Sequence, residues 1–252
     1  METPTISLNV HPQIIDLYEV LEQSGLHKQK EDVQSLVGYI ENMEYSLSAM
    51  MSEIQEMHTE VNRLHDKGIR AQCTKIVTKV EDKVQQAKTM VSIVKVKTIQ
   101  SAENAVKAFQ EKGKSALIQA VQAIRIPSVL SSMKNGLSHA ARFVRESAGR
   151  LDALREQIHE AGGHIQNAGR ALSGKVPAEP KTLKADKGLL AKIRNGLESF
   201  SSRLSDMERS TDRLLGKIQR ENAKQSVKSE LYQLKAGRSE PAKAPVAKEQ
   251  AR

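Results

Sequence analysis

The sequence predicts an all-α protein: long antiparallel helices forming a coiled-coil-like bundle, followed by a C-terminal helix and a disordered tail. Apolar residues recur in a 3-4 spacing over five heptads between residues 33 and 64, which is typical of a helix that packs along one narrow stripe. Two later stretches of similar length repeat the pattern. Only 3% of the 252 residues are aromatic and none is Trp, so the core must rely on aliphatic seams.

A short helix comes first, with Pro12 in its first turn and Gly25 as its left-handed cap. The first long helix follows over about residues 28–67, and Gly68 is its expected C-cap. All ten of its seam positions are apolar. They are Val33, Leu36, Ile40, Met43, Leu47, Met50, Ile54, Met57, Val61 and Leu64.

Two more long helices are expected, over about residues 70–112 and 128–172. Gly113 interrupts the chain between them, and a shorter apolar segment ends before Pro127, which biases Ile126 away from helix. The third long helix alternates large residues with small ones such as Ala161 and Ala168, which lets a neighbouring backbone approach closely. Matched lengths and short joins favour antiparallel packing within one chain.

The domain boundaries follow from composition. Residues 1–175 form the bundle core and residues 176–186, which contain Pro177 and Pro180, form a linker. Residues 187–235 carry a fourth amphipathic pattern and form the C-terminal helix. Residues 236–252 are rich in Ala, Lys, Glu and Pro and are expected to be disordered.

A parallel homodimer through the first seam is the alternative to an intramolecular bundle. Val and Ile at one seam position with Leu or Met at the other tolerate two strands. The flanking positions specify such a dimer poorly, and Val37 and Met51 broaden the stripe beyond a dimer seam. We therefore favour the intramolecular bundle and leave a homo-oligomer open.

The net charge of +9 conceals an asymmetry along the chain. Residues 1–68 hold four Lys and Arg against twelve Asp and Glu, a charge of −8, whereas residues 69–252 hold 35 against 18, a charge of +17. Two interpretations stay open. The acidic helix docks on basic helices of the same chain, which we favour, or each charged region recruits its own partner.

Rows of basic residues at helical spacing make sequence-independent nucleic-acid binding the alternative function, because such rows neutralise phosphates without reading bases. Aromatic stacking platforms are nearly absent, so this binding would be weak and salt-sensitive. The candidate contacts are Lys75, Lys79, Lys83, Arg209, Arg213, Lys217 and Arg220.

No enzymatic constellation emerges. Gly113-Lys114-Ser115 ends like a phosphate-binding loop, but Ala108 occupies the place of the required first glycine. His159 and His164 are five residues apart, about 140° around a helix, where metal ligands need to share one face. We therefore expect no enzyme, cofactor, metal or small-molecule substrate. A single cysteine and no apolar stretch of membrane-spanning length indicate a cytoplasmic protein.

Three blocks carry a family resemblance: residues 21–30 (LEQSGLHKQK), 104–113 (NAVKAFQEKG) and 167–175 (NAGRALSGK). Together they resemble an uncharacterised family of helical proteins from gut Firmicutes, encoded beside conjugative and other mobile elements. The resemblance implies a bacterial cytoplasm and an accessory role, and it carries over no functional residues. The expected function is a non-enzymatic scaffold or adaptor with an unknown protein partner.

Overall fold

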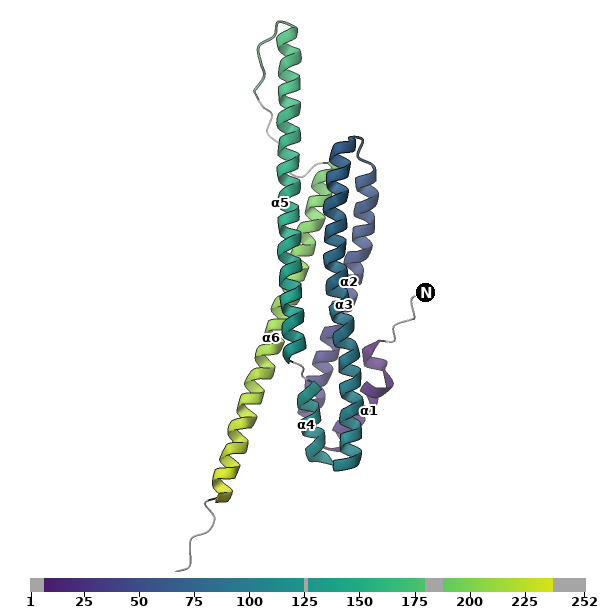
Figure 1. Ribbon diagram of the computed structural model, residues 1–252, viewed down its shortest axis with the longest axis vertical. Helices are drawn as coiled ribbons and strands as arrows, with labels where there is room; N and C mark the ends of the chain where they lie inside the picture. Colours follow the sequence, from purple (N-terminus) through teal and green to yellow (C-terminus); the bar gives the residue numbers. More distant parts are fainter. Residues whose placement is uncertain (1–6, 125–126, 180–187, 238–252) are drawn as a thin grey trace, which may run out of the picture.

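The computed structural model describes residues 7–124, 127–179 and 188–237, and within these ranges it is all-helical, without a strand (Figure 1). The elements in chain order are η1 (Leu8–Val10), α1 (Pro12–Gln23), α2 (His27–Asn62), α3 (Lys67–Lys112), α4 (Lys114–Ile124), α5 (Pro127–Leu172) and α6 (Leu189–Gly237). None of the helices described is both long and apolar enough to cross a membrane.

The N-terminal elements pack on the lower half of the long helices (Figure 1). Pro12 opens α1, where its missing N–H has no partner to lose, and Gly25 turns the chain with a φ of 66°. Glu41 of α2 anchors η1 by accepting hydrogen bonds from the backbone N–H of Asn9 at 2.9 Å and from the side chains of Ser7 and Asn9. Burial raises the pKa of Glu41, but these hydrogen bonds outweigh it and hold the pKa below its usual value.

The turn between α2 and α3 differs from the predicted one. The prediction that the first long helix runs to Lys67 and is capped by Gly68 is wrong, because α2 ends at Asn62 and Gly68 lies inside α3. Asp66 decides this boundary. Its side chain accepts a hydrogen bond from the backbone N–H of Ile69 at 2.9 Å, so it caps the N-terminus of α3, which begins at Lys67, three residues before the predicted start at about residue 70.

The later breaks fall where Gly and Pro predict them. Gly113 ends α3 with a φ of 74°, and α4 folds back along α3 from there. Helix α4 ends at Ile124 and α5 begins at Pro127, while Ile126 itself lies outside the described residues. Helix α5 then runs antiparallel to α3, and α6 returns antiparallel along α5 and α2 (Figure 1).

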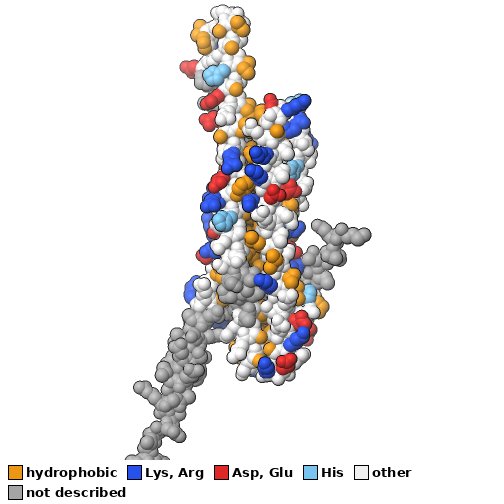
Figure 2. Space-filling view, in the orientation of Figure 1, with side chains coloured by type: hydrophobic (Ala, Val, Ile, Leu, Met, Phe, Trp, Pro, Cys, Tyr) orange, Lys and Arg blue, Asp and Glu red, His pale blue; other side chains and the backbone are white. Residues whose placement is uncertain are grey.

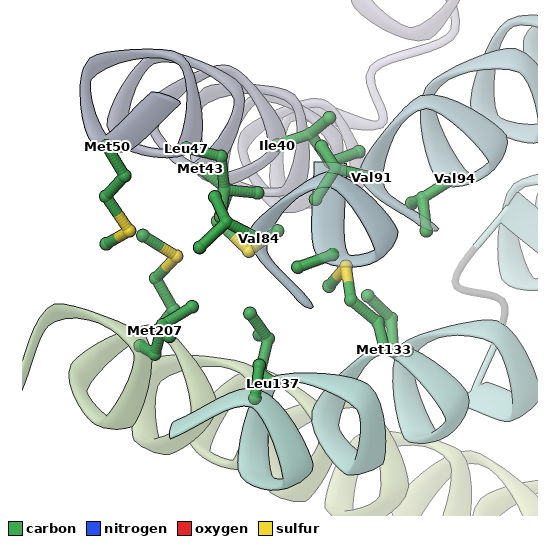
Figure 3. Packing of buried hydrophobic residues seen from close by; sticks show 14 of the residues in the cluster. Ile40, Met43, Leu47, Met50, Val84, Val91, Val94, Met133, Leu137 and Met207 are labelled. Carbon is green, nitrogen blue, oxygen red and sulfur yellow. The ribbon is translucent and has the colours of Figure 1, made fainter. Parts of the chain in front are cut away.

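The core lies where α2, α3, α5 and α6 face one another. Met50 of α2 points toward Met207 of α6, and Leu137 of α5 points toward Val84 of α3 (Figure 3). Of the ten predicted seam residues, nine are buried; Leu64 is half-buried and lies beyond the end of α2. Helices of the same chain cover the seam, so it offers no surface for a parallel homodimer.

Helix α6 joins the same core as the helices before it. Its side chains Leu197, Phe200 and Leu204 are fully buried, and α5 is the helix that it contacts most extensively. The domain boundaries at 175 and 186 stay a prediction, since residues 180–187 of the expected linker lie outside the described residues. The expected disordered tail also lies outside them, apart from its first two residues, which belong to α6.

Candidate functional site

The basic residues proposed to contact nucleic acid lie in two separate places. Lys75 and Lys79 are exposed on the first third of α3, whereas the four candidates on α6 lie beside the first third of α5. Cross-helix contacts give the register: Arg194 pairs with Asp152, and Lys134 pairs with Asp212. The two groups are therefore displaced by roughly 20 Å along the bundle, from the 1.5 Å rise per residue.

Most candidates of the α6 group are engaged by neighbours. Lys217 forms an ion pair with Asp32 of α2 at 2.9 Å, and Arg209 forms one with Asp206 at 3.3 Å. The Nε of Arg220 donates to the backbone carbonyl of Gly216. Arg213 is exposed. These contacts leave less of the α6 row to phosphates than the sequence suggests.

The α3 group instead lines a groove with α5. The groove has a volume of about 360 Å³, and we call it the basic groove. Its walls carry Lys75, Lys79 and Arg150, three exposed cations that form no ion pair with a carboxylate among the described residues. Phe143 and Ile76 supply apolar surface between them. Figure 2 shows Lys and Arg gathered between α5 and α3 on this face, with apolar atoms among them.

Sequence reasoning found only half of this groove. The spacing of Lys75 and Lys79 places both on one face of α3, but Arg150 enters only because α5 packs antiparallel to α3. Lys83, the third member of the predicted row, is half-buried and donates to the side chain of Gln86 at 3.1 Å. No signal in the sequence joins residue 150 to residue 75, because helix pairing is a tertiary choice.

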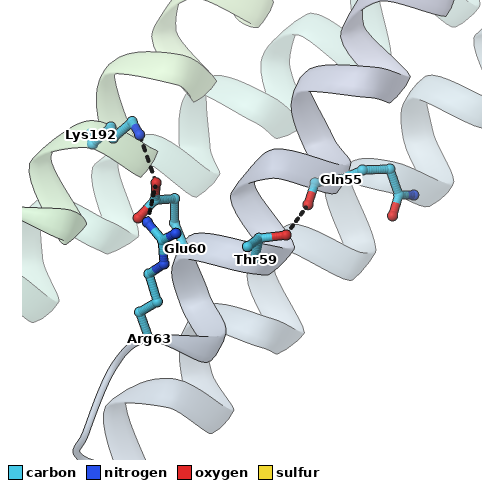
Figure 4. A network of polar contacts seen from close by, with 5 residues as sticks. All are labelled: Gln55, Thr59, Glu60, Arg63 and Lys192. Carbon is cyan, nitrogen blue, oxygen red and sulfur yellow. Dashed lines mark hydrogen bonds and ion pairs between the residues drawn. The ribbon is translucent and has the colours of Figure 1, made fainter.

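The acidic side of α2 docks on cations of the same chain. The carboxylate of Glu53 accepts hydrogen bonds from both terminal nitrogens of Arg203 of α6, at 2.7 and 2.9 Å. Near the end of α2, the carboxylate of Glu60 forms ion pairs with the ammonium of Lys192 of α6 at 2.7 Å and with the guanidinium of Arg63 at 3.2 Å (Figure 4). The hydrogen bond from Lys192 is the main cause that lowers the pKa of Glu60. These contacts agree with the favoured interpretation of the charge asymmetry, in which the acidic helix docks on basic helices of the same chain.

A second candidate site is the outer end of α5, which projects beyond the bundle (Figure 1). We call residues 156–172 the α5 arm. It is 17 residues long, about 25 Å at 1.5 Å per residue, and none of these residues is buried. The expectation that a neighbouring backbone approaches the third helix closely at Ala161 and Ala168 is not met in this part: both residues are exposed, Ile165 is 74% exposed and Leu172 is 90% exposed.

The chain that follows α5 turns back along the α5 arm. This strap, residues 173–179, is tied to the helix by Asn167, whose side chain accepts from the backbone N–H of Ala178 at 2.8 Å and donates to its carbonyl at 3.2 Å. Arg170 donates to the carbonyl of Val176 at 2.8 Å. A cavity of about 740 Å³ opens between strap and helix and is lined by His159, His164 and Glu179, among others.

Two histidines and two glutamates are among the residues that line the cavity. Among the described residues, no group of three His, Cys, Asp or Glu side chains is placed to hold a metal ion. Cys73 lies far from it in the core, and burial raises the pKa of its thiol to about 11. A thiol with that pKa is protonated at neutral pH, and the thiolate is the nucleophilic form of cysteine.

Fold and surface together define a helical-bundle protein with a projecting helix and a basic groove. Comparison with known proteins places it further: the chain belongs to a family of unknown function, DUF6674, whose model matches residues 10–252. No curated protein and no solved structure matches it. The match extends through α6 to the end of the chain, beyond the blocks on which the sequence resemblance depends.

Proposed function

We propose that this protein is a non-enzymatic helical scaffold or adaptor that associates with other protein chains through the α5 arm. One observation carries the proposal: the apolar stripe of α5 continues past the bundle, where Ile165 and Leu172 are exposed to water. Large exposed apolar side chains that follow one another along a helix mark interaction surfaces in soluble proteins.

The bundle holds the α5 arm in a fixed direction. The inner part of α5 is buried between α3 and α6 through residues such as Leu137, Val144 and Leu151. The α5 arm is the uninterrupted continuation of that helix, so its direction follows the bundle rather than a flexible hinge. A partner bound there would be held at a defined distance and angle from the rest of the protein.

The proposal includes where the scaffold acts. The blocks at residues 21–30, 104–113 and 167–175 resemble helical proteins of gut Firmicutes encoded beside mobile elements. That resemblance supports an accessory role next to the transfer machinery of a mobile genetic element, in a bacterial cytoplasm.

Affinity capture from the native host tests the role of the α5 arm. Tagged wild-type protein, Ile165→Asp and the control Gln166→Asp would be compared by mass spectrometry of the captured proteins, which include any untagged copy of this chain. Both variants add one carboxylate to the same turn, but only residue 165 lies on the apolar stripe. Proteins retained by wild type and control but lost from Ile165→Asp support the proposal. Identical capture by all three would refute it.

The basic groove favours a second candidate function, sequence-independent nucleic-acid binding. Three cations without carboxylate partners converge there from two helices, and phosphate contacts of this kind release counterions. The affinity for DNA should then fall steeply with salt and be equal for unrelated sequences. The molecule offers few aromatic platforms for bases, in keeping with contacts to the backbone alone.

Gel retardation at about 50 mM salt separates the two functions. Lys75→Gln with Lys79→Gln should weaken binding to duplex and single-stranded DNA. Lys97→Gln with Lys112→Gln is the matched control, because it removes two charges from exposed positions on the same helix, outside the groove. Equal loss in both double variants would assign binding to net charge alone, and no retardation of the wild type would end the nucleic-acid hypothesis.

A further inference from the structure

The α5 arm has the composition of one half of an antiparallel helix pair. We infer that the other half is the α5 arm of a second copy of this chain, so that the protein forms a two-fold symmetric dimer joined arm to arm. The inference rests on the proposed function, since it assigns an occupant to the same surface. Its grounds are the register of the stripe, the face that the strap leaves open, the uncharged flanks and the shape of the bundle end.

The stripe of the α5 arm alternates large and small residues. Ile158 and Ile165 occupy one seam position, and Ala161 and Ala168 occupy the other. The same two positions are filled by Leu137, Ala140 and Val144 where α5 is buried in the bundle, so the arm continues an established packing face. Facing layers of large against small residues let two helices interdigitate at close range.

A two-fold axis near Gly163 pairs these layers without a conflict. In an antiparallel pair, one seam position packs opposite the other seam position of the partner helix. Ile158 then lies opposite Ala168 of the second copy, and Ala161 lies opposite its Ile165. The exposed Leu172 falls opposite Leu154, which is half-buried at the edge of the core. Each seam residue of one arm therefore faces a seam residue of the other copy, and no pair sets two large β-branched side chains against each other.

The strap leaves this face open. Asn167 and Arg170, the two residues that hold it, are about 200° and 140° around the helix from Ile165 at 100° per residue. The strap therefore covers the far side of the α5 arm, in agreement with the 74% exposure of Ile165. Among the described residues, the strap lies on one side of the arm, and the apolar side carries the exposed Ile165 and Leu172.

The flanks of the stripe add no repulsion. Within the arm, none of the residues beside the seam is Lys, Arg, Asp or Glu. They are Gln157, Gly162, His164, Gly169 and Ala171. Lys, Arg, Asp or Glu at these positions would oppose pairing of two identical helices through repulsion of like charges, and the sequence has none of them there. Gly162 lies beside the axis, where the missing side chain allows close approach.

The shape of the bundle selects the antiparallel arrangement. In a parallel pair, each partner helix would continue inward along the seam of α5, into the space that α3 already fills. In the antiparallel pair, each arm ends where the other bundle begins, near Leu154 and the turn after α2. The interface is short, below the roughly 1,200 Å² of standard complexes, so we expect reversible association in the micromolar range.

Sedimentation velocity of the purified full-length protein over a concentration series tests the association. Wild type and Gln166→Asp should shift from monomer to dimer with concentration. Ile165→Asp should raise the dissociation constant by more than about tenfold, since each copy would bury an unpaired carboxylate against alanine. Residue 165 is exposed in the monomer, so its replacement leaves the fold intact, which circular dichroism checks.

Disulfide trapping tests the arrangement. Proteins with Ala161→Cys or Ile165→Cys, mixed under mild oxidation, should form the mixed 161–165 disulfide, whereas a parallel pair would give 161–161 and 165–165 links, because only facing residues come within about 7 Å. The native Cys73 is fully buried and does not interfere. A protein that stays monomeric up to millimolar concentration, a dimer insensitive to Ile165→Asp, or self-links in place of the mixed link would each overturn the inference. A monomer that still captures a host protein through Ile165 would leave the proposed function standing and remove only the dimer.

Discussion

Lys95 of α3 and Glu44 of α2 form an ion pair with 2.8 Å between the ammonium and the carboxylate, and Lys95 lies within the core at 6% exposure. Val91 and Val94 of the same helix are also buried, and the ammonium of Lys95 is paired with Glu44. This pair joins α2 to α3 far from their connecting turn. The two partners differ in burial, since the side chain of Glu44 is about three times as exposed as the side chain of Lys95, at 23% against 7%.

Glu44→Ala should therefore cost about 3 kcal/mol of unfolding free energy, because it leaves a buried ammonium without its partner. Lys95→Met should cost less, since the carboxylate left behind can still be hydrated. The control is Glu103→Ala, which breaks the exposed Lys107–Glu103 pair and should cost less than about 0.5 kcal/mol although that pair is closer, at 2.6 Å. Urea unfolding measures all three, and equal costs for Glu44→Ala and Glu103→Ala would contradict this account of burial.

Met50→Asp tests the packing of the α2 seam. Met50 is fully buried and points toward Met207 of α6, so an aspartate there places an unpaired charge in the core and should cost about 4 kcal/mol (Figure 3). Ser52→Asp adds the same charge at an exposed position two residues later and should change stability by no more than about 0.5 kcal/mol. A loss below about 1 kcal/mol for Met50→Asp in a urea melt would show that the seam is open to water.

The strap should be released by Asn167→Ala. This change removes both hydrogen bonds to Ala178, and trypsin should then cut after the exposed Lys175 faster than in wild type. The urea midpoint should stay the same, because no core residue is altered. Gln166→Ala on the same turn is the control. Cleavage near Gly113 ahead of Lys175 would mean that the bundle opens before the strap does.

Glu41 makes the stability depend on pH. Its pKa is held below the ordinary value of 4.5, so its contribution is complete above that pH and is lost as the pH falls through the lowered pKa. Wild type should be more stable than Glu41→Gln at neutral pH, and the difference should shrink as the pH falls through the lowered pKa of Glu41, below which both side chains are uncharged. Urea midpoints from neutral to acid pH measure this. A difference that stays constant over that range would show that η1 does not depend on the carboxylate.

The sequence by itself determined the helices. The 3-4 spacing between Val33 and Val61 makes one face of α2 apolar whatever covers it, and that face is buried. Gly25 and Gly113 turn the chain where only a residue without a side chain adopts a positive φ easily. These are local properties, set by residues within a few turns of one another, and sequence patterns report them directly.

The tertiary structure decided which helices meet and where their contacts end. The sequence pattern placed the end of the first long helix at Gly68, but Gly68 lies inside α3. Asp66 sets the start of α3 instead, because its side chain accepts a hydrogen bond from a backbone N–H that has no partner within the helix. Ile165 has the same periodicity as the buried Leu151, yet it is exposed, since α2, α3 and α6 do not extend beside it. Lys75 and Arg150 share a groove only through the pairing of α3 with α5. A periodic pattern shows that one face of a helix is apolar. The lengths and positions of the neighbouring helices decide whether that face is covered.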